Sequence, residues 1–86
     1  MNTIKKIQFI NLGINNCIKH GLRDEANEKL EQVLIKVDQL PNTHEKEELQ
    51  LNYNAMKQDL YNIYDLSVMD SLMEINNYMI DKLLNF

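Results

Sequence analysis

The second half of the chain, from Thr43 to Phe86, contains no glycine and no proline. Apolar residues recur along it in steps of three and four, which is the spacing of one buried stripe on a helix. This pattern favours a single long helix over residues 43–85 and an all-α fold. The residues of the stripe are Leu49, Tyr53, Met56, Leu60, Tyr64, Val68, Leu72, Ile75, Met79, Leu83 and Phe86.

Two shorter helices are predicted before the long one, over residues 3–20 and 24–40. The first gathers its isoleucines and Cys17 on one face at about 100° per residue. Gly21 suits the left-handed position that follows a helix, and Leu22 can then contact Cys17 in a Schellman motif. Because the link is short, the two helices should form an antiparallel hairpin that packs on the long helix.

Capping residues predict where the third helix starts and whether it is interrupted. Asn42 is the expected N-cap, with Glu45 at the third helical position reaching back to it. Ser67, followed by Asp70, is a second capping signature, which would break the helix at residues 65–67 and give a four-helix bundle. The apolar steps nevertheless pass through this region without a gap, at about 3.7 residues per step. We therefore favour the continuous helix and keep the break as the alternative.

The length of the third helix determines the predicted interface. A helix of about 42 residues is ~63 Å long, whereas each helix of the hairpin is only ~27 Å long. The uncovered half of the long helix would need a second copy or another protein to bury its stripe. Phe9 and Leu12 lie off the main stripe of the first helix. With Gly13 they either form a second contact surface or are ordinary isolated exposed residues, and the sequence leaves both open. The predicted interface residues are Phe9, Leu12, Leu72, Ile75, Met79, Leu83 and Phe86.

Length, charge and cysteine content favour a single-domain cytoplasmic protein and argue against a nucleic-acid-binding, disulfide-rich or membrane-spanning one. With 86 residues and a mass of 10.2 kDa, the chain is expected to form one domain over residues 1–86. Its net charge of −4 argues against nucleic acid as a partner, because a basic patch is the usual footprint. A single cysteine excludes an internal disulfide and fits the reducing cytoplasm. No stretch approaches the roughly 20 apolar residues of a membrane span.

The residues that carry chemistry do not form a catalytic or metal-binding pattern. Cys17 and His20 have the spacing of two zinc ligands, but the only other histidine, His44, lies in the predicted inter-helix turn. Ser67 and Ser71 lie in or beside the predicted cap, and no sequence pattern pairs either serine with the general base that a nucleophile needs. No glycine-rich phosphate loop is present. We therefore expect no enzyme activity, no cofactor and no metal, with Cys17 as a structural thiol.

The leading functional prediction is a non-enzymatic protein-binding module. It would act as a homo-oligomeric adaptor or chaperone-like binder of a protein partner, with a homodimer as the expected state. The alternative is a small acidic inhibitor or immunity-type protein that folds as a compact monomer. Four tyrosines either add an adaptable binding surface or fill the core, and the sequence leaves both open. They are Tyr53, Tyr61, Tyr64 and Tyr78.

Overall fold

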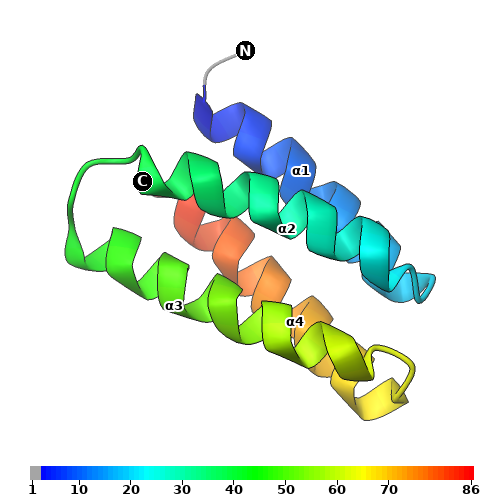
Figure 1. Cartoon of the computed structure of the whole chain (residues 1–86). Helices are drawn as coiled ribbons and strands as arrows, with labels where there is room; N and C mark the ends of the chain where they lie inside the picture. Colours follow the sequence, from blue (N-terminus) through cyan, green and yellow to red (C-terminus); the bar gives the residue numbers. More distant parts are fainter. Residues whose placement is uncertain (1–2) are drawn as a thin grey trace.

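The computed structural model describes residues 3–86 and folds them into an antiparallel bundle of four α-helices. Two helical hairpins make up this bundle, as Figure 1 shows. The all-α fold and the first hairpin are confirmed. The elements are α1 (Thr3–Lys19), α2 (Arg23–Asp38), α3 (His44–Asp59), the 3-10 helix η1 (Leu60–Asn62) and α4 (Leu66–Leu84).

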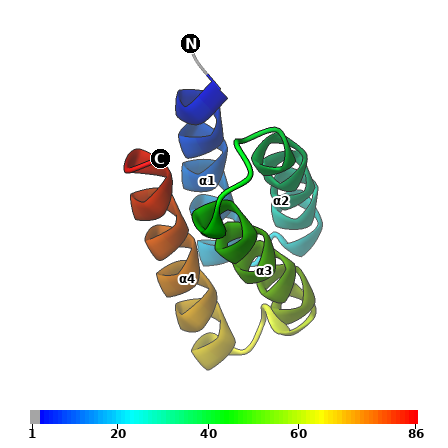
Figure 2. The ribbon, with the colours of Figure 1, turned by 90° about the vertical axis from the view of Figure 1, so that its left-hand side faces the viewer.

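The four helices form a closed ring. Each packs against its neighbours along the chain, and α4 returns to pack against α1, so that the first and last helices lie side by side (Figure 2). The contact between α1 and α2 is the most extensive, followed by that between α1 and α4. The molecule measures 35 × 25 × 18 Å. This closure means that every helix has its apolar stripe covered within one chain.

The turn between α1 and α2 follows the predicted Schellman motif. Gly21 has a φ of 69°, which lies in the left-handed region. The Leu22 N–H donates to the Cys17 carbonyl at 2.9 Å, and the Gly21 N–H donates to the Ile18 carbonyl at 3.0 Å. These bonds satisfy carbonyls that the end of α1 would otherwise leave free.

The prediction of one continuous helix over residues 43–85 is wrong. The chain leaves α3 through η1, and α4 begins at Leu66 after a break at Asp65, whose ψ is 121°. The Asp65 carboxylate accepts from the Ser67 N–H at 2.9 Å and from the Ser67 hydroxyl at 2.7 Å. A polar side chain of this kind satisfies a free N–H at the start of a helix. Asp65, and not Ser67, is therefore the cap of α4.

Lys46 holds the link between α2 and α3 through hydrogen bonds from its side chain. This side chain is only 8% exposed, and its ammonium donates to the Asp38 carbonyl at 2.7 Å and to Asn42 Oδ1 at 2.9 Å. A cation suits the carbonyl end of a helix such as α2. Thr43, rather than the predicted Asn42, caps α3 by accepting from the Lys46 N–H at 3.2 Å.

α3 and α4 are joined on the surface through Glu48. Its carboxylate pairs with the Lys82 ammonium and accepts from the Tyr78 hydroxyl at 3.4 Å. The Lys82 ammonium also lies 5.4 Å from the centre of the Tyr78 ring. The hydrogen bond to Lys82 holds the pKa of Glu48 below its usual range and raises that of Lys82.

The core is built from residues spaced alternately three and four apart on each helix. This is the heptad spacing of coiled-coil-like bundles, in which side chains of one helix fit between those of its neighbours. Three of these buried positions hold polar residues or a tyrosine rather than an aliphatic side chain. The central positions are Ile7, Asn11, Ile14 and Ile18 on α1, Ala26, Leu30, Val33 and Val37 on α2, Leu49, Tyr53 and Met56 on α3, and Leu72, Asn76, Met79 and Leu83 on α4.

Candidate protein-binding site

The predicted interface on the C-terminal helix is mostly core. Leu72, Met79 and Leu83 are fully buried, and Ile75 and Phe86 are partly buried and pack against the same core. These residues were expected to be uncovered because the helix was expected to be continuous. Since the helix breaks at Asp65, the stripe turns inward and is covered by the chain itself.

The predicted surface on α1 is exposed. Phe9 is 68% exposed and Leu12 is 59% exposed, and the two lie about one turn apart on the helix. Gly13 was expected to join them, but it faces α2 instead, because a Cβ added there would lie 3.5 Å from Cδ of Lys29. Phe9 and Leu12 therefore form a small apolar pair without Gly13.

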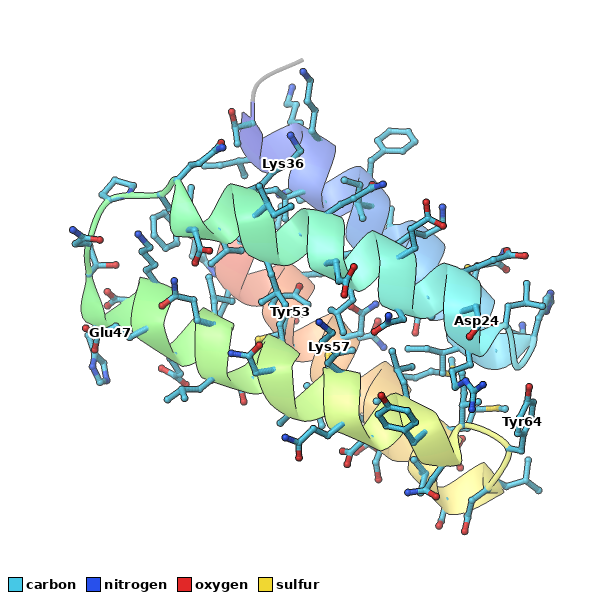
Figure 3. The ribbon with its side chains drawn as sticks, viewed as in Figure 1. Asp24, Lys36, Glu47, Tyr53, Lys57 and Tyr64 are labelled. Atoms are coloured by element: carbon cyan, nitrogen blue, oxygen red, sulfur yellow. The ribbon has the colours of Figure 1, made fainter. Side chains whose placement is uncertain are left out.

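A larger apolar surface lies where the α1–α2 turn meets the segment between α3 and α4. Both lie at the same end of the bundle (Figure 1), and Tyr64 projects between them (Figure 3). The Tyr64 ring covers Gly21 closely, since a Cβ on Gly21 would lie 3.4 Å from the Tyr64 Cε1. Tyr61, Tyr64 and Leu66 are each about three-quarters exposed, and Leu22 is partly exposed. We call Leu22, Arg23, Asp24, Tyr61, Tyr64 and Leu66 the two-turn end.

Two shallow hollows shape this surface, and both are lined by Arg23 and Asp24. One, of about 130 Å³, extends towards Tyr61, and the other, of about 220 Å³, extends towards Tyr64. Arg23 Nε lies 3.5 Å from Asp24 Oδ1, so the guanidinium has a carboxylate neighbour on the surface. Tyrosine and arginine are enriched among the residues that dominate binding energy in protein interfaces. Leu22 adds apolar area beside Tyr64.

The charge around the two-turn end is mainly negative. Asp24, Glu25, Asp59 and Asp65 are exposed there. Hydrogen bonds from Ser67, chiefly from its hydroxyl, hold the pKa of the Asp65 carboxyl below its usual range and so keep it ionised. Of the cations at this end, Lys57 is paired with Glu31 at 2.8 Å, Arg23 lies 3.5 Å from Asp24, and Lys19 is exposed. A partner surface with an apolar centre and a basic rim would complement this arrangement.

A further hollow follows the seam between α2 and α3. It has a volume of about 560 Å³ and is lined by Leu34, Asp38, Glu47, Gln50, Leu51 and Asn54. Glu47 points outward at the start of α3 in Figure 3. The Asp38 carboxylate is held by the Gln50 amide across the seam. This surface has fewer aromatic side chains than the two-turn end.

The core contains a group of polar side chains that the apolar pattern of the sequence did not predict. Asn11 and Asn76 are both fully buried, and the Asn76 side-chain amide donates to the backbone carbonyl of Asn11 at 2.7 Å. Tyr53 is also fully buried, and burial raises the pKa of its hydroxyl, an effect that the neighbouring Asn11 side chain reduces. The signal was the presence of asparagine at two heptad core positions.

Cys17 is buried at 4% exposure, as expected for a structural thiol. Burial raises the pKa of this thiol, which disfavours the reactive thiolate. Over residues 3–86, no group of three or more His, Cys, Asp and Glu side chains is placed to hold a metal ion. Within the same range, no helix is both long enough and apolar enough to cross a membrane.

Comparisons with protein-family models, with curated proteins and with solved structures gave no significant match.

Proposed function

We propose that this chain is a non-enzymatic protein-binding module that acts as a closed monomer, in the manner of a small acidic inhibitor or immunity-type protein. The two-turn end is the proposed contact surface. Its partner would be a protein whose surface combines an apolar centre with basic residues at the rim.

The observation that carries the proposal is the exposure of Tyr61, Tyr64 and Leu66 in one short segment at the end of a bundle whose own core is complete. Tyr64 shares a hollow with Leu22, and Tyr61 shares one with Arg23 and Asp24. Because the break before α4 allows the chain to cover its own stripe, folding alone does not require a second copy. The exposed side chains at the two-turn end are supported by packed helices and not by a long loop. Rigid aromatic groups of this kind lose little entropy when they bind.

The test compares two surface variants of matched design. Tyr61→Ser with Leu66→Ser removes the apolar centre of the two-turn end, and Ile35→Ser with Leu51→Ser removes exposed apolar residues from α2 and α3. Proteins recovered with each tagged variant from the native host would be compared with those recovered by the unchanged chain. We expect a partner that is retained by the α2–α3 variant and lost by the two-turn variant.

The expected loss can also be measured as affinity once a partner is purified. Removing a side chain that dominates an interface costs about 2 kcal/mol or more, which corresponds to at least ~30-fold weaker binding. Circular dichroism would confirm that both variants remain helical. Equal recovery by the two variants would reject the two-turn end as the contact surface.

A homo-oligomeric adaptor is the second candidate, and the exposed pair Phe9 and Leu12 favours it. In that case light scattering would give at least twice 10.2 kDa, and changing both residues to serine would return the mass to that of one chain. A mass of one chain at micromolar concentrations would favour the closed monomer.

A further inference from the structure

α4 carries a second apolar stripe beside the one that fills the core. Its residues follow one another at steps of three, four, seven and four, so they share one face of the helix. Leu66 and Leu84 at its ends are 75% and 63% exposed, and the three stripe residues between them are partly buried. We call Leu66, Met69, Met73, Ile80 and Leu84 the outer stripe.

The outer stripe lies on the side of α4 that borders α1. Asn76 marks that side, because its side-chain amide donates to the backbone carbonyl of Asn11 on α1. Tyr78 and Lys82 mark the other side, because both contact Glu48 on α3. At about 100° per residue, the outer stripe lies within about 80° of Asn76, in the direction away from Lys82. It therefore follows the outside of the seam between α1 and α4, which lie side by side in Figure 2.

The edge of α1 that faces this seam is uncharged. Its residues are spaced four, three and four apart, and they are Ile4, Gln8, Asn11 and Asn15. On α4, Met69 and Met73 pack partly against the core, and methionine adapts readily to the shape of a bound partner. From Leu66 to Leu84 the outer stripe is ~27 Å long at 1.5 Å per residue, which is the length of a partner helix of about 18 residues.

A row of carboxylates borders the outer stripe on its solvent side. Asp70, Glu74 and Asp81 are all exposed and lie next to the stripe, further around α4. None of the three forms an ion pair with another of residues 3–86. The border on α1 has Lys5 and Lys19 near the two ends of that helix. An apolar stripe with an acidic row along α4 is complementary to a helix whose apolar face has basic residues along one edge.

We propose that the partner contributes an amphipathic helix of this kind, which lies along the outer stripe with its basic row against α4. Leu66 belongs both to the outer stripe and to the two-turn end, so the two surfaces are continuous. A second copy fits less well, because its α4 offers the same acidic row and each chain has a net charge of −4. This inference rests on the proposed function as a protein-binding module and extends the contact beyond the two-turn end.

The first test uses a fluorescein-labelled peptide of about 18 leucine and lysine residues, whose leucines recur every three and four positions. Fluorescence anisotropy should show saturable binding, and amide NMR should place the shift changes along α1 and α4. A version with glutamate in place of lysine, and a shuffled version whose leucines share no face, should each bind at least ~10-fold more weakly. Equal binding of the shuffled peptide would overturn the proposal.

A pair of variants tests the apolar part of the surface. Met73→Gln with Leu84→Ser should weaken binding of the lysine peptide at least ~10-fold. The matched control, Ile35→Ser with Leu51→Ser, removes exposed apolar residues from α2 and α3 and should leave the affinity unchanged. Circular dichroism would confirm that both variants are helical. Equal affinities of the two variants would rule out the outer stripe.

A charge reversal tests the acidic row with exposed residues only. The variant Asp70→Lys, Glu74→Lys and Asp81→Lys should bind the glutamate peptide more tightly than the lysine peptide. The matched control has the same change in net charge at exposed residues elsewhere and should still prefer lysine. If the reversed variant also prefers lysine, the acidic row does not contact the peptide and the proposal fails. The control substitutions are Glu28→Lys, Glu47→Lys and Asp59→Lys.

A partner recovered from the native host separates this inference from the proposed function. It should be lost by Met73→Gln with Leu84→Ser as well as by the two-turn variant. A partner that the outer-stripe variant retains and the two-turn variant loses would overturn the helix inference and leave the proposed function standing. Retention by both variants would overturn both. Light scattering that gives two chains per particle, returned to one by Met73→Gln with Leu84→Ser, would instead assign the outer stripe to a second copy.

Discussion

Gly21 allows α1 to end and α2 to start close behind it. Its φ of 69° lies where a Cβ is unfavourable, and the ring of Tyr64 occupies the space beside it. Gly13, in contrast, lies within α1, and a Cβ there would make only ordinary contact with Lys29. Alanine should therefore act in opposite directions at the two glycines.

We expect Gly21→Ala to lower the free energy of unfolding by about 1–2 kcal/mol, because alanine is strained in the left-handed region. Gly13→Ala should raise it by about 0.5–1 kcal/mol, because alanine favours a helix interior. Urea unfolding followed by circular dichroism measures both. A stabilising Gly21→Ala would show that the turn does not need the left-handed conformation.

Single residues also set the limit of what the sequence could predict. The Schellman turn was predictable because glycine alone adopts the left-handed conformation without strain. Asn11 and Asn76 were not predicted as core residues, because asparagine is usually exposed and interrupts an apolar stripe. Among the tyrosines, the spacing placed Tyr53 and Tyr64 on the buried stripe and left Tyr61 off it. The structure buries Tyr53 but exposes Tyr64 as well as Tyr61, because the chain has left the helix before Tyr64.

At the scale of elements, the break between α3 and α4 has a geometric reason. Each four-residue step along a straight helix advances about 40° beyond a full turn. The three steps from Leu60 to Leu72 would therefore rotate the stripe by about 120° and turn the buried face of α4 away from that of α3. The regular three- and four-residue spacing of the apolar residues favoured a continuous helix. The accumulated rotation of about 120° between Leu60 and Leu72 instead favours a break, which the structure has at Asp65.

We expect Asp65→Ala to lower the melting temperature by about 4–8 °C, because α4 loses its cap. Asp65→Asn keeps a side-chain acceptor and should stay close to the unchanged chain. Since Ser67 lowers the pKa of Asp65, the stabilisation from its charge is present at neutral pH and is lost as the pH falls through that lowered pKa. Asp65→Asn should therefore remove this part of the acid sensitivity. Equal melting temperatures for the alanine and asparagine variants would contradict the cap.

At the scale of the whole molecule, the candidate site was harder to predict than the fold. The residues of the two-turn end come from two segments, around Leu22 to Asp24 and around Tyr61 to Leu66. They meet only when the two hairpins pack together, so no local pattern marks them. The predicted interface was wrong for Leu72, Met79 and Leu83 for the same reason, since their covering comes from other helices.

The closed ring predicts that the bundle unfolds as one unit. Leu72 is fully buried and Leu84 is 63% exposed, although both are leucines of α4. Leu72→Ala should lower the free energy of unfolding by about 2–5 kcal/mol, and Leu84→Ala should change it by less than about 0.5 kcal/mol. The free energy of unfolding of a small domain is usually only about 5–15 kcal/mol, so the loss caused by Leu72→Ala would destabilise all four helices of the described bundle.

Thermal unfolding followed by circular dichroism and by the tyrosine signal should give coincident transitions for Leu72→Ala. If α4 were instead an extension beyond an independent hairpin, this substitution would melt α4 first and leave α1 and α2 folded. Coincident transitions are expected because α4 contacts both α1 and α3, so that loosening it exposes the core residues of its neighbours.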